Sequence, residues 1–171
     1  KKEFKLNITV ILNGNKTILE APADLPLVDV LRLQSCYSVK SGCRSGHCGA
    51  CTVLLNDNPV SSCKIPVGII NNCEIITIEY FKTKPEYQTI MQGFEEADIH
   101  LCGYCDSGRI FSAYQIIKQN KQFSRAEIYE QVKHLAPCCT DIDTYVNGIL
   151  FAKKILDKGY TKTQKIILGR K

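Results

Sequence analysis

Four cysteines between positions 43 and 63 limit the fold of this chain more than any other feature. Three of them stand at C-x4-C-x2-C spacing and a fourth follows after eleven residues: Cys43, Cys48, Cys51 and Cys63. This is a spacing at which thiolates hold a [2Fe–2S] cluster. Such a loop must turn its amide N–H groups toward the sulfur atoms. Gly42, Gly46 and Gly49 supply the backbone freedom that this curvature needs.

A zinc site is the alternative for the same four cysteines. Structural zinc sites usually contain two knuckles of the C-x2-C kind, and only Cys48 and Cys51 form one in this stretch. Ligand type and spacing therefore favour an iron–sulfur cluster over zinc.

The composition is that of an ordinary globular protein, apart from the cysteines. Of 171 residues, 44% are hydrophobic, 23% are charged and 10 are cysteine. We see no signal peptide and no apolar run long enough for a membrane span, so we expect a cytoplasmic protein, with no membrane contact, whose cysteines bind metal. Basic residues gather at 153–171 and predict a solvated tail. Nucleic-acid binding is the weaker alternative, because no aromatic-basic motif accompanies the charges, and we expect no nucleic-acid partner.

Apolar residues alternate along the first eighty positions and predict a small mixed sheet packed on one helix. Asn13 and Gly14 mark the turn of an opening hairpin. Asp24 is expected to cap the helix, with Pro26 in its first turn. The predicted elements are strands over 4–12 and 16–20, a helix containing 27–33, and strands over 52–55, 60–63 and 75–79.

The apolar period changes from 2 to 3.6 residues after a polar linker at 81–85. Ser124 and Glu127 form a capping box, and Thr140 or Asp141 is expected to cap the last helix. The switch predicts two domains in an α+β chain, with an all-α four-helix domain second. The predicted domains cover residues 1–80 and 86–171, and the helices lie near 87–97, 107–119, 124–132 and 145–155.

Two interhelical turns carry a second set of cysteines. Cys102 and Cys105 lie between the first and second predicted helices, and Cys138 and Cys139 lie between the third and fourth. In an antiparallel bundle these turns fall at one end, so four thiols can converge on a second [2Fe–2S] site. A thioredoxin-like redox pair or half of a zinc site are the alternatives for the C-x2-C pair, although no βαβ pattern surrounds it.

Across nearly its full length the chain resembles the small iron–sulfur subunit of the molybdenum hydroxylases, the xanthine dehydrogenase family. The family motif G-C-x-x-G-x-C-G-A-C-T-V stands at 42–53, with Cys63 as the fourth cysteine, and Q-C-G-Y-C-T-P-G is partly matched at 101–108. The resemblance implies a β-grasp domain of the plant-type ferredoxin-like kind, then a four-helix domain, each with one [2Fe–2S] cluster. It also implies partner subunits that carry a molybdenum–pterin cofactor and FAD.

The sequence departs from the family pattern at three places. Leu101 replaces a glutamine that bonds the pterin in the family, and it cannot make that contact. Residues 106–107 replace a threonine–proline pair. The family's last motif, C-R-C-T, is replaced by proline, cysteine, cysteine and threonine at 137–140. Cys139 thus matches the second cysteine, and Cys138 becomes a ligand if the turn shifts by one residue. Otherwise the second cluster has three cysteines and a substitute ligand, or does not form.

We therefore expect an electron conduit in an oxidoreductase complex rather than a chain with catalytic residues. The resemblance implies that electrons pass from the molybdenum–pterin subunit to the helical-domain cluster, then to the β-grasp cluster, and on to FAD. It also implies that a purine or another N-heterocycle is oxidised on the partner. A free-standing two-domain ferredoxin or a redox-sensing module is the alternative, and such a carrier would purify alone. Cys36 and Cys73 match no ligand position and are expected to behave as small buried apolar residues.

Overall fold

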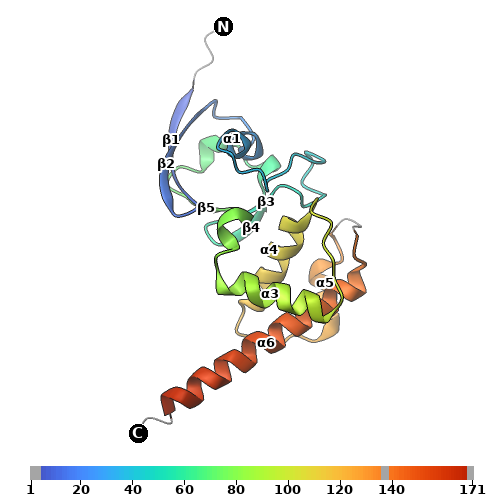
Figure 1. Cartoon of the computed structure of the whole chain (residues 1–171). Coiled ribbons are helices and arrows are strands. Elements are labelled where there is room, and N and C mark those ends of the chain that lie inside the picture. The colour runs from blue at the N-terminus through green and yellow to red at the C-terminus, as the bar shows by residue number, and fades with distance from the viewer. Residues whose placement is uncertain (1–4, 136–138, 169–171) are drawn as a thin grey trace. The chain divides into compact units, whose positions relative to one another are not determined.

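The computed structural model describes residues 5–135 and 139–168, which fall into two compact units (Figure 1). The first unit contains the residues up to Lys84 together with Cys102–Ser112, and the second contains Pro85–Leu101 and the residues from Ala113 onward. The predicted domain limits, 1–80 and 86–171, place the segment 102–112 differently, and they stay a prediction. No helix in the described part of the chain has the length and apolar character needed to cross a membrane.

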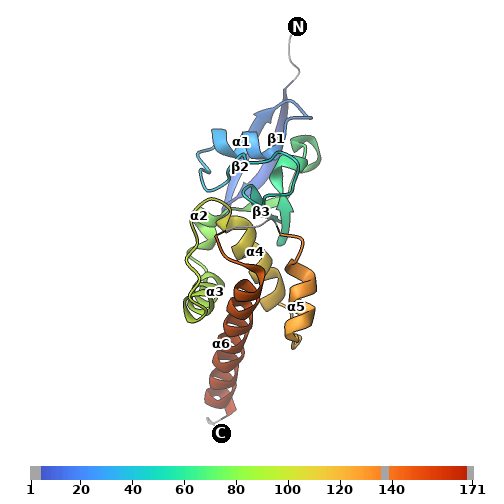
Figure 2. The same ribbon diagram turned by 90° about the vertical axis from the view of Figure 1, so that its right-hand side faces the viewer.

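A five-stranded mixed sheet forms the centre of the first unit (Figure 2). Its order is β2-β1-β5-β3-β4, with β1 and β5 parallel and the other pairs antiparallel. Asn13 and Gly14 have φ values of 51° and 81°, as the predicted two-residue hairpin turn requires. The strands are β1 (Leu6–Leu12), β2 (Asn15–Ala21), β3 (Thr52–Leu55), β4 (Asn58–Ser61) and β5 (Glu74–Ile76).

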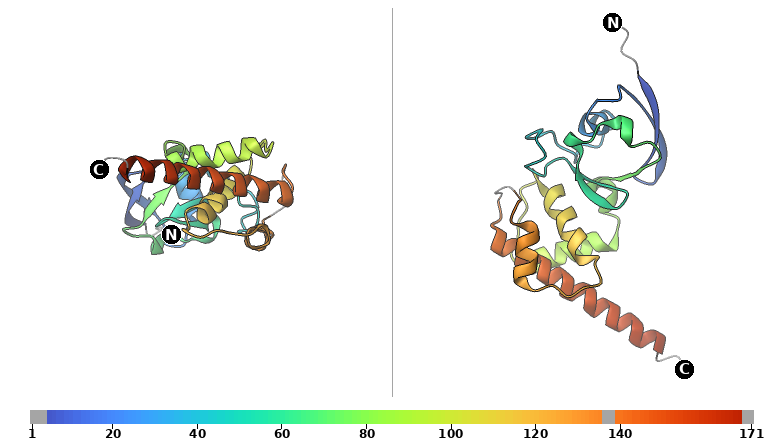
Figure 3. Two further views of the ribbon diagram at one scale, coloured as in Figure 1. Left: turned by 90° about the horizontal axis from the view of Figure 1, so that it is seen from below. Right: turned by 180° about the vertical axis from the view of Figure 1, so that it is seen from behind.

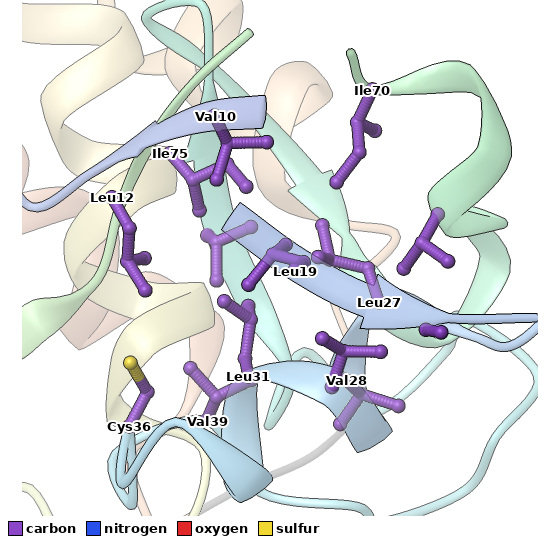
Figure 4. Close-up of a cluster of buried hydrophobic side chains, with 14 of the residues drawn as sticks. Val10, Leu12, Leu19, Leu27, Val28, Leu31, Cys36, Val39, Ile70 and Ile75 are labelled. Atoms are coloured by element: carbon purple, nitrogen blue, oxygen red, sulfur yellow. The ribbon is translucent and has the colours of Figure 1, made fainter. Parts of the chain in front are cut away.

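Helix α1 (Leu27–Leu33) places its apolar side in the core of this unit (Figure 4). Leu27, Val28 and Leu31 are fully buried there, in one cluster with strand residues such as Val10 and Leu19. Alternation in β1 thus predicted its buried face correctly. The prediction that Asp24 caps α1 is wrong, because Pro26 occupies the N-cap position and no side chain bonds the first turn.

The passage from the sheet to the helical half also differs from the prediction. β5 ends at Ile76, and a short helix α2 (Ile78–Phe81) occupies residues assigned to a strand and a linker. The Thr77 amide donates to Asn13 Oδ1 at 2.9 Å. This bond to the side chain of a hairpin-turn residue ends β5, and the chain continues into α2. Two 3₁₀ turns precede β5, η1 (Ser62–Lys64) and η2 (Val67–Ile69).

The second unit is helical, as predicted (Figure 3). Both α3 and α5 pack against the long helix α6, and Phe94 meets Tyr145 edge to face with ring centroids 5.7 Å apart. The helices of this half are α3 (Pro85–Glu96), α4 (Asp106–Ile117), which begins in the first unit, α5 (Arg125–Val132) and α6 (Ile142–Leu168).

The caps of α5 and α6 follow the sequence signals. Ser124 and Glu127 form the predicted capping box. Of the two candidates for α6, Asp141 makes the cap, because its carboxylate accepts from the Thr144 amide at 2.9 Å. The predicted basic tail at 153–171 is helical over its described part, because α6 continues to Leu168. Lys154 and Lys158 are exposed, as a solvated tail requires. Lys153 is buried, and its Nζ donates to the carbonyl oxygen of Gln119 at 2.8 Å, beyond the end of α4.

Helices α3 and α6 approach closely at three small residues, Gly93 of α3 and Gly148 and Ala152 of α6. A Cβ added to Gly93 would lie 2.4 Å from the nitrogen of Ala152 and 2.6 Å from the oxygen of Gly148. Both atoms belong to the α6 backbone, which cannot move aside as a flexible side chain would. Only glycine therefore fits at this position of α3.

We expect Gly93→Ala to lower the free energy of unfolding by about 1–3 kcal/mol through overpacking. Gly159→Ala in α6 is the matched control, because its new Cβ meets nothing within 4 Å. The control should be neutral or stabilising by up to about 1 kcal/mol, since glycine is a poor helix former. Thermal unfolding followed by circular dichroism measures both changes. An unchanged melting temperature for Gly93→Ala would contradict the close packing of α3 on α6.

Candidate metal centres

The first cysteine loop directs its backbone amides at the sulfur of Cys43. The N–H groups of Ser45, His47 and Cys48 donate to this Sγ at 3.4, 3.3 and 3.3 Å. In return, the amide of Cys43 donates to Cys48 Sγ at 3.4 Å. Amide donors around thiolates are what a protein uses to orient and tune an iron–sulfur cluster.

The bends of this loop depend on residues with unusual backbone requirements. Arg44 has a φ of 55° and Gly46 a φ of 81°. The Arg44 guanidinium bonds both carboxylate oxygens of Asp29 in α1, at 2.7 and 3.0 Å. A Cβ at Gly42 would lie 2.7 Å from Cys48 Sγ, so a larger residue there would displace the sulfur. The loop is therefore fastened to α1 and shaped by glycine where it curls.

The β3–β4 hairpin brings the last two cysteines of the first set together. Thr52 pairs with Ser61 in the antiparallel register, so the residues flanking this pair, Cys51 and Ser62, also meet. Ser62 bonds the Cys51 carbonyl oxygen twice, through its amide at 3.3 Å and its hydroxyl at 2.6 Å. Cys63 follows directly in η1, so the sheet places it beside Cys51.

The pKa values of two thiols in the first set, Cys43 and Cys63, are shifted in opposite directions. A hydrogen bond from the Ser45 side chain, followed by the amides of Cys48 and Ser45, lowers the pKa of Cys43 to about 5. Burial, the hydrogen bond with Cys51 and the nearby sulfur atoms raise the pKa of Cys63 to about 11. Adjacent thiolates repel one another and need a cation to be ionised together. A set of four soft sulfur donors with inward amides fits an iron–sulfur cluster.

The segment that carries the second C-x2-C pair packs onto the first loop within the first unit. Ser107 Oγ donates to the carbonyl oxygens of Gly49 and Ala50, each at 3.2 Å. A Cβ at Gly108 would lie 2.9 Å from the Cα of Gly49. The sequence did not predict this role of Ser107, which departs from the family motif at this position.

Asp106 closes the turn between Cys102 and Cys105. Its carboxylate accepts from the Gly103 amide at 3.0 Å, and Gly103 takes a φ of 88°. Cys105 is buried at the start of α4, whereas Cys102 is exposed. The acidic residue that replaces the family threonine is therefore part of the turn itself.

The rest of the second set is described only in part. Cys139 belongs to the second unit, is exposed, and has its Sγ 3.9 Å from Thr140 Oγ1. Cys138 lies outside the described residues, and so does Pro137. Within residues 5–135 and 139–168, no three His, Cys, Asp or Glu side chains are gathered as a metal-binding group. The convergence of either set of four thiols on one cluster therefore stays a prediction.

The two remaining cysteines pack in or against the core of the first unit. Cys36 is buried among apolar residues (Figure 4), and burial raises its pKa to about 11. Cys73 is partly buried, and Asn56 Nδ2 donates to its Sγ at 3.4 Å. The prediction of small buried residues is thus confirmed for Cys36 and holds in part for Cys73.

Both halves of the chain match families of iron–sulfur domains. Residues 10–68 match the model of the family described as "2Fe-2S iron-sulfur cluster binding domain". Residues 77–150 match that of the "[2Fe-2S] binding domain" family. The chain therefore contains two [2Fe–2S]-binding domains, and both cysteine sets fall inside the matched ranges.

Several known proteins resemble the chain over most of its length. It is 35% identical over 125 residues to the nicotinate dehydrogenase small FeS subunit of Eubacterium barkeri, across 72% of this chain and 80% of that one. It is 29% identical to the xanthine dehydrogenase iron-sulfur-binding subunit of Escherichia coli O157:H7, across 87% of this chain and 95% of that one. A chain of quinoline 2-oxidoreductase from Pseudomonas putida 86 superposes with a TM-score of 0.79 at 25% identity, across 91% and 98% of the two chains. The chain belongs to the family of small [2Fe–2S] electron-transfer subunits of the multi-subunit molybdenum hydroxylases.

Proposed function

We propose that each cysteine set holds one [2Fe–2S] cluster, which supplies one-electron redox chemistry when bound. The inward amides around Cys43 support the first site. The second rests on the family match over residues 77–150, which contains all four cysteines of that set. The proposed ligands are Cys43, Cys48, Cys51 and Cys63 for the first cluster, and Cys102, Cys105, Cys138 and Cys139 for the second.

Single electrons pass, in this proposal, from a molybdenum–pterin subunit to the second site, then to the first site, and on to an FAD subunit. The chain's own residues hold the two C-x2-C turns close together and bury the side chains of Cys51, Cys63 and Cys105. Ser107 and Gly108 support this role, because they join the second C-x2-C segment to the loop at Gly49. Cys51 is 2% exposed and Cys63 9%, so these thiols are largely shielded from water.

An aromatic N-heterocycle is the proposed substrate of the partner subunit. Relatives named for nicotinate and xanthine, and a structure named for quinoline, support this class. Aldehyde oxidoreductases are also among the relatives, so turnover of aldehydes alone by the purified complex would overturn the substrate class. Leu101 has no hydrogen-bonding side chain and contributes only apolar contact toward a pterin. We place the complex in the cytoplasm, because a reducing compartment keeps cysteine thiols available as cluster ligands.

We expect Cys48→Ser to remove or strongly perturb the EPR signal of one cluster, because serine replaces a thiolate ligand of the first site. When the complex is mixed anaerobically with the substrate that it turns over, the other cluster should still be reduced, while flavin reduction should largely stop. Cys73→Ser is the control, since this cysteine lies outside both sets. An unchanged iron content and spectrum in Cys48→Ser would contradict the first ligand set.

Iron analysis tests the second site. Four irons per chain are expected, and two would reject the helical half as a redox site. We further expect Cys139→Ser and Cys138→Ser each to damage the second cluster, which EPR of the separate variants measures. An intact second cluster in Cys138→Ser would show that its fourth ligand lies elsewhere in the chain.

A further inference from the structure

Lys40 bonds the backbone of both C-x2-C turns in the first unit. Its amide donates to the carbonyl oxygen of Ala50 at 3.0 Å, and Ala50 lies between Cys48 and Cys51. Its Nζ donates to the carbonyl oxygen of Gly103, which lies between Cys102 and Cys105. One residue thus connects the corresponding turns of the two cysteine segments.

Two further contacts show that these segments lie close together. A Cβ at Gly42 would be 3.0 Å from the hydroxyl oxygen of Tyr104, and one at Gly108 would be 2.9 Å from the Cα of Gly49. The peptide groups of Gly103 are held on both sides, since Asp106 accepts from its amide while Lys40 donates to its carbonyl. The Lys40 ammonium therefore has a fixed position at the second turn, next to the first loop.

We propose that Lys40 is a positioning residue that ties the two turns together, and that its positive charge raises the reduction potential of both clusters. The inference rests on the proposed two-cluster function. Reduction adds negative charge to a cluster, and a nearby cation stabilises the reduced form. The charge of Arg44 is already paired with Asp29, whereas the Lys40 ammonium bonds a carbonyl of the second turn itself.

Redox titrations followed by EPR on the assembled complex test this role through Lys40→Met. Both potentials should fall by about 59 mV, which is a roughly tenfold change in the ratio of oxidised to reduced cluster for a one-electron couple. Lys40→Arg keeps the charge and should restore both values. Lys64→Met is the matched control, because Lys64 lies against Gly46 of the first loop and adjoins Cys63. Lys64→Met should leave the potential of the second cluster unchanged, and any shift should be confined to the first cluster.

The outcomes separate this inference from the function on which it rests. Four irons per chain with unmoved potentials in Lys40→Met would overturn the inference and leave the two-cluster function intact. Two irons in the unmodified chain would overturn both. If Lys40→Met loses iron, Lys40→Gln replaces it, since glutamine keeps a donor without the charge. The same fall is expected there, and unchanged potentials in Lys40→Gln would overturn the inference.

Discussion

Three amide groups that point at one sulfur atom are the interaction around which the first loop is built. The N–H groups of Ser45, His47 and Cys48 reach Cys43 Sγ only because the backbone turns through left-handed values at Arg44 and Gly46. The surrounding fold maintains this path: Arg44 is fastened to α1, and the β3–β4 hairpin fixes the chain where the loop ends. The sheet and α1 thus serve to present a shaped loop.

Hydrogen bonds and close backbone contacts also fix the second C-x2-C segment against the first loop. Lys40 and Ser107 bond carbonyl groups across the two segments, and Gly49 and Gly108 let their backbones touch. An electron relay needs its sites near one another, and here backbone contacts bring the two turns together. Membership in the molybdenum hydroxylase subunits agrees with this arrangement and removes support from a free-standing carrier or a redox sensor.

Local sequence signals predicted most elements of the fold, because they act over a few residues. The turn at Asn13 and Gly14 and the capping box at Ser124 formed as their local chemistry dictates. The predictions were wrong where contacts between residues far apart in the sequence determine the end of a strand or the burial of a side chain. Thr77 bonds a side chain 64 positions away and ends β5 early. Lys153 is buried because its ammonium donates to the carbonyl oxygens of Ile117 and Gln119, at the end of α4 and just beyond it. At the site, the spacing of the first cysteines predicted the loop, but no local pattern could show that Lys40 and Ser107 join it to a segment about sixty residues away.

Pulsed EPR of the reduced, iron-loaded chain grown with [15N]serine tests the loop geometry most directly. The amide of Ser45 donates to Cys43 Sγ, so the signal of the first cluster should show a 15N coupling. Ser45→Ala keeps the amide but loses its label, together with the hydroxyl that bonds Cys43, and the Ser45 contribution to the coupling should disappear in that variant. Identical spectra for the two proteins would show that the Ser45 amide does not bond the cluster sulfur, and would contradict the account of the loop given above.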